Sequence, residues 1–211
     1  MDLTIPESLR GLVTETRKKY RLEHERWAAD AFGRHVLSEV SDNVWLCERP
    51  KDSAYHFYVA MPQHAIIVYG DIGEMILRPG WNRSIGWLRG ALREGEGEYF
   101  DYLLEKVPSP HRREVFMPGD AIEHMVDEAR DDPDSYGSNQ RVLDEFAEAV
   151  DTHGDIRTVR ESWVDAIYEC GYDGEYCIMF DEPDAEMYWC AHALRWFMKE
   201  WVKQYGDTEG H

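Results

Sequence analysis

The sequence is poor in cysteine and in long apolar runs. Of its 211 residues only 4 are cysteine, and none of them form a Cys-x-x-Cys pair. Sparse, unpaired cysteines are typical of free thiols in a reducing compartment. No run approaches the ~20 apolar residues of a membrane helix, and the first residues lack the apolar core of a signal peptide. We therefore expect a soluble intracellular protein that does not bind membranes.

The familiar catalytic motifs are also missing. The sequence contains no Gly-x-Ser-x-Gly elbow, no phosphate-binding loop, no dinucleotide-binding glycine pattern and no His-Glu-x-x-His pair. Cys190 lies two residues from His192, but on a segment that is apolar on most sides, where a buried inert thiol is the favoured interpretation. No catalytic residue, bound metal or cofactor is therefore assigned, and a non-enzymatic role is favoured.

Basic residues are scarce in the second half of the chain. Residues 1–93 contain 13 Lys and Arg against 12 Asp and Glu, whereas residues 94–211 contain 10 against 30. Aromatic residues make up 13% of the chain, which is typical of folded proteins and not of disordered acidic ones, so we expect the chain to fold despite its net charge of −19. Such a one-sided field repels nucleic acid and anionic membranes and attracts basic partners. Direct binding to nucleic acid is therefore not expected.

Apolar periodicity predicts an α+β fold, in which a small antiparallel meander of about four strands packs against several helices. Helices are expected over 5–13, 22–40, 84–92, 98–104, 121–130, 139–152, 157–170 and 184–203, and strands over 44–47, 55–59, 65–69, 75–77 and 176–180. The expected organisation is N-terminal helices (1–42), the meander with its following helix (43–93), and an acidic, mainly helical region (94–211) that forms one compact unit with the sheet.

A Gly-Asp-Ile-Gly-Glu segment at residues 70–74 separates two of the expected strands. Gly70 and Gly73 permit positive φ on either side of a tight hairpin turn, and the Asp71 carboxylate is suited to accept hydrogen bonds there. We expect this segment to have a structural role, because the carboxylates of Asp71 and Glu74 supply too few oxygen ligands for a hard cation.

An ordered set of motifs resembles a group of uncharacterised phage and prophage proteins. The set is the strand Ser53-Ala54-Tyr55-His56-Phe57-Tyr58-Val59, then Ile66-Ile67-Val68-Tyr69 with the Gly-Asp-Ile-Gly-Glu turn, then Gly86-Trp87-Leu88. The resemblance covers roughly residues 43–90. It implies a viral accessory product that acts in the cytoplasm of the host cell. The group carries no established catalytic residues, so none is transferred.

The central acidic segment is the candidate binding surface. Rows of carboxylates on stiff helices imitate the charge of duplex phosphates and would fit a basic groove. The residues assigned to partner binding are Glu123, Asp127, Glu128, Asp131, Asp132 and Asp134. With the viral resemblance, this favours a counter-defence inhibitor, an anti-CRISPR-like DNA mimic that binds a host or defence-system protein. Plain solubility is the simpler explanation of the same composition.

Other interpretations remain open at this point. A metal-dependent hydrolase would use Glu123, His124 and Asp127 of one helix, with Asp71 as a further ligand, although capping by Asp120 and a solvated acidic face also explain that segment. A phage structural or assembly role is a further alternative. Trp and Arg residues after the sheet form a candidate mixed protein-binding patch; they are Arg78, Trp81, Arg83, Trp87, Arg89 and Arg93.

Overall fold

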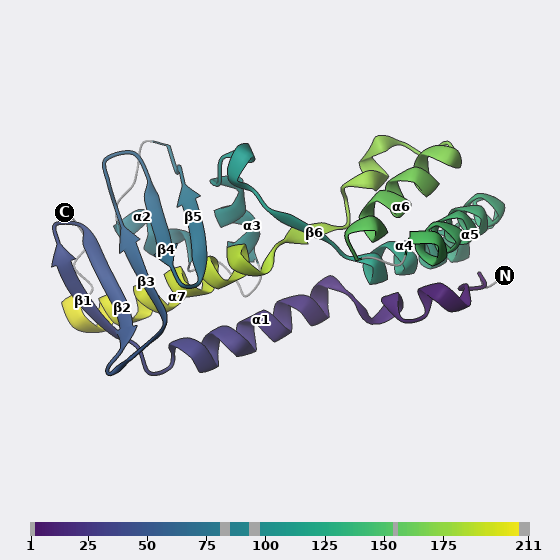
Figure 1. Cartoon of the computed structure of the whole chain (residues 1–211). Coiled ribbons are helices and arrows are strands. Elements are labelled where there is room, and N and C mark those ends of the chain that lie inside the picture. Colours follow the sequence, from purple (N-terminus) through teal and green to yellow (C-terminus); the bar gives the residue numbers. More distant parts are fainter. Residues whose placement is uncertain (1–2, 81–84, 93–97, 154–155, 207–211) are drawn as a thin grey trace. The chain divides into compact units, whose positions relative to one another are not determined.

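The computed structural model describes residues 3–80, 85–92, 98–153 and 156–206 (Figure 1). It contains a five-stranded antiparallel sheet and several helices, which dominate the C-terminal half, so the predicted α+β class is confirmed. The chain forms two compact units. The helical unit comprises Met1–Arg21 and Glu114–Glu182, and the sheet unit comprises Leu22–Arg113 and Pro183–His211. The acidic region was expected to form one compact unit with the sheet; instead only its two ends, up to Arg113 and from Pro183, belong with the sheet, and residues 114–182 form a separate unit with the N-terminal residues.

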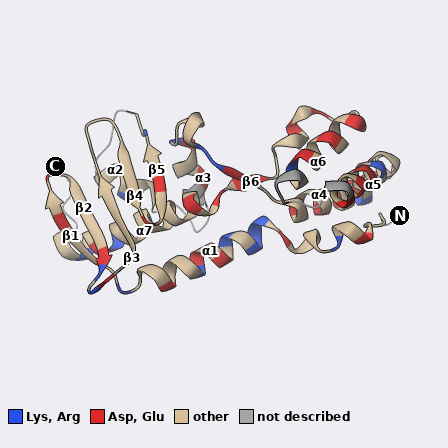
Figure 2. Cartoon of the chain, viewed as in Figure 1, with Lys and Arg blue, Asp and Glu red and all other residues tan. Residues whose placement is uncertain are grey.

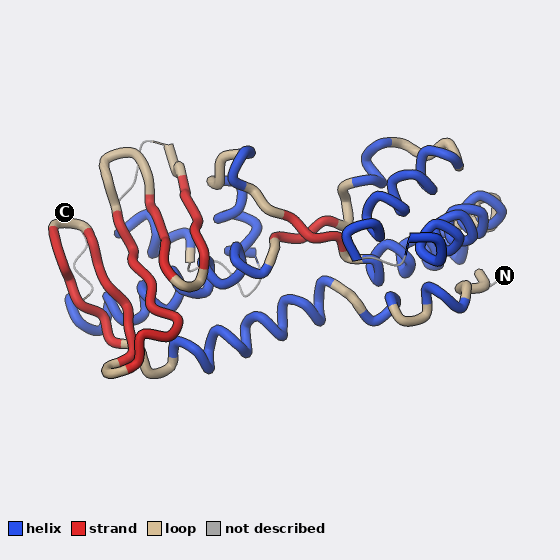
Figure 3. Tube along the Cα trace, in the orientation of Figure 1, coloured by secondary structure: helices blue, strands red, loops and turns tan. Residues whose placement is uncertain are grey.

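The sheet is a meander in which the strands lie side by side in chain order (Figure 3). Its strands are β1 (Val36–Ser41), β2 (Val44–Arg49), β3 (Asp52–Ala60), β4 (Ile66–Gly70) and β5 (Gly73–Leu77). Alternate residues are buried, as in Trp45 and Cys47 of β2, because one face packs on helix α7 (Ala185–Tyr205). The Trp45 and Phe197 rings lie 5.3 Å apart in this layer.

The predicted hairpin turn joins β4 to β5. Gly70 pairs with Gly73, which leaves Asp71 and Ile72 as the two loop residues. Both glycines adopt positive φ, 149° and 106°. A Cβ on Gly70 would lie 2.4 Å from the His56 carbonyl oxygen, so glycine is required by space as well as by conformation. The Asp71 carboxylate lies 2.8 Å from His56 Nδ1.

Helix α7 is the predicted C-terminal helix, and it begins where the sequence indicates. The Asp184 carboxylate accepts a hydrogen bond of 2.9 Å from the Met187 amide and caps its first turn. His192 of this helix is buried. The sheet unit also contains α2 (Ile85–Ala91), α3 (Glu98–Glu105) and the 3₁₀ turn η3 (Ser109–His111).

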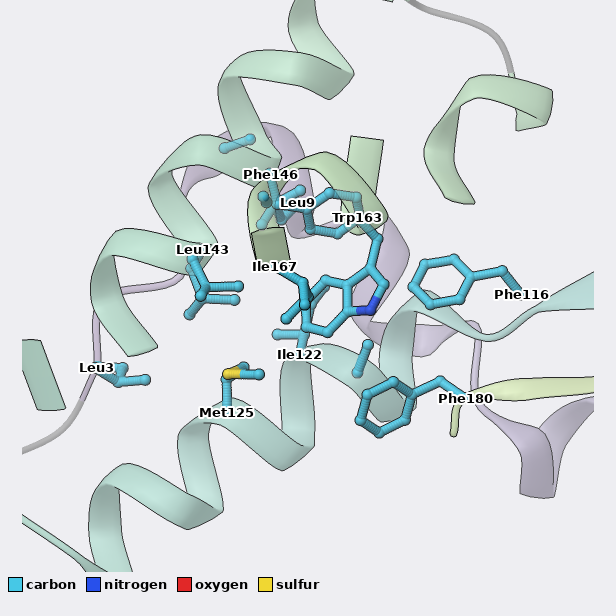
Figure 4. Packing of buried hydrophobic residues seen from close by; sticks show 14 of the residues in the cluster. Leu3, Leu9, Phe116, Ile122, Met125, Leu143, Phe146, Trp163, Ile167 and Phe180 are labelled. Atoms are coloured by element: carbon cyan, nitrogen blue, oxygen red, sulfur yellow. The ribbon is translucent and has the colours of Figure 1, made fainter. Parts of the chain in front are cut away.

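The helical unit is built on three helices around an aromatic core. It contains the 3₁₀ turns η1 (Glu7–Leu9), η2 (Leu12–Thr14) and η4 (Gly174–Cys177), and the helices α4 (Pro118–Asp131), α5 (Tyr136–His153) and α6 (Ile156–Glu169). Strand β6 (Glu114–Phe116) pairs with β7 (Asp181–Pro183). Trp163 of α6 is fully buried against Phe116, Phe146 and Phe180 (Figure 4).

Three sequence predictions about local structure were wrong. The helix expected over 22–40 is α1 (Arg17–Phe32) followed by β1, because the chain breaks at Gly33 and the β-branched Val36 and Val40 enter the sheet. The N-terminal helix is reduced to η1 and η2, with Gly11 between them. The strand expected over 176–180 is the end of η4 and a turn, from which Ile178 points to solvent.

Candidate protein-binding surface

Carboxylates outnumber basic groups in the helical unit, with 23 Asp and Glu against 9 Lys and Arg. The excess lies in residues 114–182, which contain 20 Asp and Glu against 4 Lys and Arg. Figure 2 shows Asp and Glu along α5 and α6. The acidic residues of these helices whose burial is described are all exposed except Glu145, which is half-buried. Because buried apolar residues alternate with exposed acidic ones along each helix, α5 and α6 each have one apolar side in the core and one acidic side facing solvent.

Helix α4 carries the most regular row of carboxylates. Glu123, Asp127 and Asp131 are spaced four residues apart, so they lie along one side of the helix, and all three are exposed. We call these residues the α4 stripe. Asp127 forms an ion pair of 2.6 Å with Arg130, while no ion pair is formed by Glu123 or Asp131 among the described residues. These three predicted residues are therefore brought together.

Asp132 and Asp134 continue the acidic surface into the loop after α4. Both are exposed. The Asp132 carboxylate accepts a hydrogen bond of 3.1 Å from the Asp134 amide, and its backbone oxygen accepts one of 2.7 Å from the Ser135 hydroxyl. Asp132 thus shapes the turn as well as adding charge, whereas the Asp134 side chain faces solvent.

Glu128 differs from the other predicted residues, because its carboxylate is used inside the unit. It accepts hydrogen bonds from Asn139 Nδ2 at 3.1 Å and from the Tyr176 hydroxyl at 3.2 Å. Asn139 is fully buried, and its side-chain oxygen accepts a hydrogen bond from the Tyr172 hydroxyl. Burial, and next the Glu128 charge, raises the pKa of Tyr172 to about 12 and also raises that of Tyr176, so both hydroxyls stay protonated donors. Glu128 therefore joins α4 to α5 and η4.

Asp120 has a role that local sequence did not indicate. The capping position of α4 is Met117, since the helix begins at Pro118. The Asp120 carboxylate instead accepts a hydrogen bond of 2.6 Å from the backbone amide of Arg17, the first residue of α1. It therefore caps a different helix from the predicted one, through a contact that spans 103 positions in the chain.

The residues of the hydrolase alternative do not form a metal site. The His124 ring packs between Tyr176 and Phe180, with centroids at 5.6 and 5.4 Å. Asp71 belongs to the β4–β5 turn of the sheet unit and pairs with His56. Over the described ranges, no group of three or more His, Cys, Asp or Glu side chains is placed to hold a metal ion.

The cysteines are free thiols whose surroundings oppose nucleophilic chemistry. Burial raises the pKa of Cys190 to about 12 and also raises that of Cys47, which disfavours the reactive thiolate. Burial, with Arg195 and His24 nearby, lowers the pKa of His192 to about 3. A protonated thiol and a neutral imidazole, two residues apart on one helix and so not facing each other, do not form the ion pair of a cysteine nucleophile.

A second acidic surface lies between η1 and α5. A hollow of about 460 Å³ there is lined by Pro6, Glu7, Ser8, Asp144, Ala147, Glu148 and Asp151. Glu7 is paired with Arg10 at 2.5 Å, and Asp144 accepts a hydrogen bond of 3.0 Å from Gln140. The carboxylates of α5 thus extend the charged surface of the unit.

The Trp and Arg patch after the sheet is only partly within the described residues. Trp81, Arg83 and Arg93 lie outside them. Trp87 is half-buried, with its ring 6.0 Å from that of Tyr102. This contact fits an internal anchor of α2 and α3.

Sequence periodicity missed three exposed apolar residues near η4, namely Tyr168, Ile178 and Met179. The run from Tyr176 to Phe180 is continuous in apolar character, which predicts a strand. Asp173-Gly174 before it is a turn signal that would have favoured the observed 3₁₀ turn.

No protein-family model, curated protein or solved structure matches the chain. No helix within the described residues is long and apolar enough to span a membrane. The expected resemblance of residues 43–90 to phage and prophage proteins therefore stays a prediction from the ordered motifs. It assigns no role to any residue, so function has to be inferred from the surfaces of the molecule.

Proposed function

We propose that this protein is a non-enzymatic interaction protein that binds a basic, nucleic-acid-binding surface of another protein. The α4 stripe, with Asp132 and Asp134 beside it, supplies the contact. Glu128 is left out of this set, because its carboxylate already accepts two internal hydrogen bonds.

The observation that carries the proposal is the surplus of carboxylates over partners. Residues 114–182 contain 4 basic residues, and the three whose side chains the structure describes are each paired internally. Arg130 pairs with Asp127 at 2.6 Å, Arg160 with Asp181 at 2.5 Å, and Arg141 with Glu145 at 3.8 Å. The exposed acids of the α4 stripe and the following loop thus face solvent with little compensation.

The physical role of such a surface is to accelerate and orient association. A field of one sign steers a partner of opposite charge and raises the association rate by about 10–10³-fold. Each exposed ion pair adds only about 0.2–1 kcal/mol, so several must act together. At physiological ionic strength the screening length is about 8 Å, which limits the effect to charges on the facing surface.

The biological role that best fits this chemistry is interference with a host or defence-system protein. An acidic helical face imitates duplex phosphates and would occupy a groove that normally holds nucleic acid. Together with the resemblance to phage proteins, this supports a viral counter-defence inhibitor, anti-CRISPR-like in action, in the cytoplasm of the host cell.

The test is capture of the partner with tagged protein in lysate of host cells. We expect a nucleic-acid-binding protein that duplex DNA displaces from the tagged chain. The variant Glu123→Lys, Asp127→Lys, Asp131→Lys should lose this capture. A matched control, Asp30→Lys, Glu39→Lys, Asp42→Lys, makes the same change of net charge at exposed positions of the sheet unit. Equal capture by both variants would contradict the proposal.

A further inference from the structure

The helical unit exposes a cluster of large apolar side chains around η4. Tyr168, at the end of α6, is 61% exposed; Ile178 and Met179, after η4, are 62% and 44% exposed. We call these three residues the η4 patch. Single exposed apolar residues are normal on protein surfaces, but contiguous ones mark interaction sites.

Local geometry places the three residues at the two ends of the four-residue turn η4. The Gly171 amide donates to the Tyr168 carbonyl at 3.0 Å, so the chain turns back at the end of α6. A Cβ on Gly174 would lie 3.6 Å from the Tyr168 hydroxyl, which places this ring over the start of η4. The Ile178 and Met179 amides both donate to the Glu175 carbonyl, at 3.2 and 3.1 Å, and hold the other two residues at the end of η4.

The exposure of Ile178 and Met179 is imposed by the residues that flank them. Cys177 and Phe180 are buried in the aromatic core, so the two residues between them point outward. Tyr176 is fixed from both sides, because its carbonyl accepts a 2.8 Å hydrogen bond from Trp163 Nε1 and its hydroxyl donates to Glu128. The patch is therefore preorganised by the core, which reduces the entropic cost of binding.

Carboxylates surround the Tyr168 side of the patch. They are Asp165, Glu169, Asp173 and Glu175, all exposed, and none forms an ion pair among the described residues. On the Met179 side, Arg17 donates to the Met179 carbonyl at 3.3 Å and also pairs with Glu182. Lys18 and Lys19, both exposed, follow Arg17 in the chain. The rim is thus acidic at one end and basic at the other, which would give a bound segment one preferred direction.

We propose that the η4 patch and its four carboxylates bind a basic amphipathic helix of a partner protein, with aliphatic residues on one side of that helix and Lys or Arg beside them. The proposal rests on the proposed function and supplies what the α4 stripe lacks, namely an apolar centre for the interface. Interfaces derive most of their affinity from such centres, and charged rims mainly set rate and specificity. Met and aliphatic side chains in an acidic surround suit helices of this kind. An anionic lipid surface is disfavoured, because the four carboxylates would repel it.

The probe is a fluorescent peptide of about 14 residues, or about four helical turns, with Leu and Lys in amphipathic order. Fluorescence anisotropy should show binding to the whole protein that the double variant Tyr168→Ser, Ile178→Ser weakens at least tenfold, about 1.4 kcal/mol. The matched control is Val40→Ser, at an apolar position of β1 that is 51% exposed, and it should bind as the unchanged protein does. Thermal melting confirms that each variant is folded.

Comparison peptides and vesicles separate the alternatives. A scrambled peptide of the same composition, or a version with Glu in place of Lys, should bind at least tenfold more weakly. Equal binding of either peptide, equal binding by the double variant, or tight binding of the protein to phosphatidylserine vesicles would overturn the inference. If the proposed function were wrong but this inference right, the results would differ. The α4-stripe variant would then capture its partner normally, while binding of the peptide would still require Tyr168 and Ile178.

Discussion

Glu128 provides a sharp test of how the acidic segment divides between structure and binding. Its carboxylate accepts hydrogen bonds from Asn139 at 3.1 Å and from Tyr176 at 3.2 Å, and Asn139 is fully buried. A hydrogen bond to a charged group contributes about 1.5–3 kcal/mol to stability. Glu128 is only partly buried, so in the variant water can form hydrogen bonds with the groups that Glu128 leaves and offset part of this loss. Asn139 also keeps its 3.0 Å bond to the Met125 carbonyl. We therefore expect Glu128→Ala to lower the free energy of unfolding by about 2 kcal/mol.

For a chain of this length, that change corresponds to a fall in melting temperature of about 4–8 °C. Glu128→Gln should lose about half as much, because the amide oxygen still accepts one of the two bonds. The control Glu123→Ala, on the exposed α4 stripe, should stay within about 0.5 kcal/mol of the unchanged protein. Urea denaturation and thermal melting measure all three. A Glu128→Ala protein that melts normally but no longer captures its partner would refute this assignment.

Three further outcomes concern the folded state. Trp163→Ala should cost about 3–5 kcal/mol in urea unfolding, because it empties the aromatic core, whereas Trp163→Phe should cost less by retaining a ring. His192 has a folded-state pKa of about 3, below its usual 6.5, so the protein is most stable above pH 6.5 and loses stability as the pH drops towards 3. Between pH 6.5 and 5 the free energy of unfolding should fall by about 2 kcal/mol. The same pH dependence of stability in His192→Leu would count against this role of His192. Gly70→Ala should lower the free energy of unfolding by about 2 kcal/mol, because the new Cβ would lie 2.4 Å from the His56 carbonyl oxygen. Gly90→Ala, whose Cβ meets open space in α2, should raise it by about 0.5–1 kcal/mol. Equal stability of the two variants would contradict the steric argument.

The elements that sequence predicted well are those decided by local chemistry. Helix α7 combines an apolar length with a capping Asp184, and the β4–β5 hairpin has two glycines at the required positions. Both depend on residues a few positions apart. The helix expected over 22–40 failed because its second half pairs with β2, and pairing energy outweighs helical periodicity in a short segment.

The candidate site was predictable in charge but not in detail. The spacing of Glu123, Asp127 and Asp131 predicts the stripe that is observed. The internal role of Glu128 depends on Tyr176, which is 48 positions away, and that of Asp120 on Arg17, which is 103 positions away. Local sequence carries no information on such contacts, and it likewise concealed the outward direction of Ile178 in an apolar run.

The most direct measurement of the central claim is the association rate with the captured partner as salt is varied. By stopped flow at low salt, Glu123→Lys, Asp127→Lys, Asp131→Lys should associate at least tenfold more slowly than the unchanged protein, and the difference should shrink as salt rises. The control reversed at Asp30, Glu39 and Asp42 should keep most of its rate. If the stripe variant associates as fast as the unchanged protein at every salt concentration, the acidic face of α4 does not contact the partner.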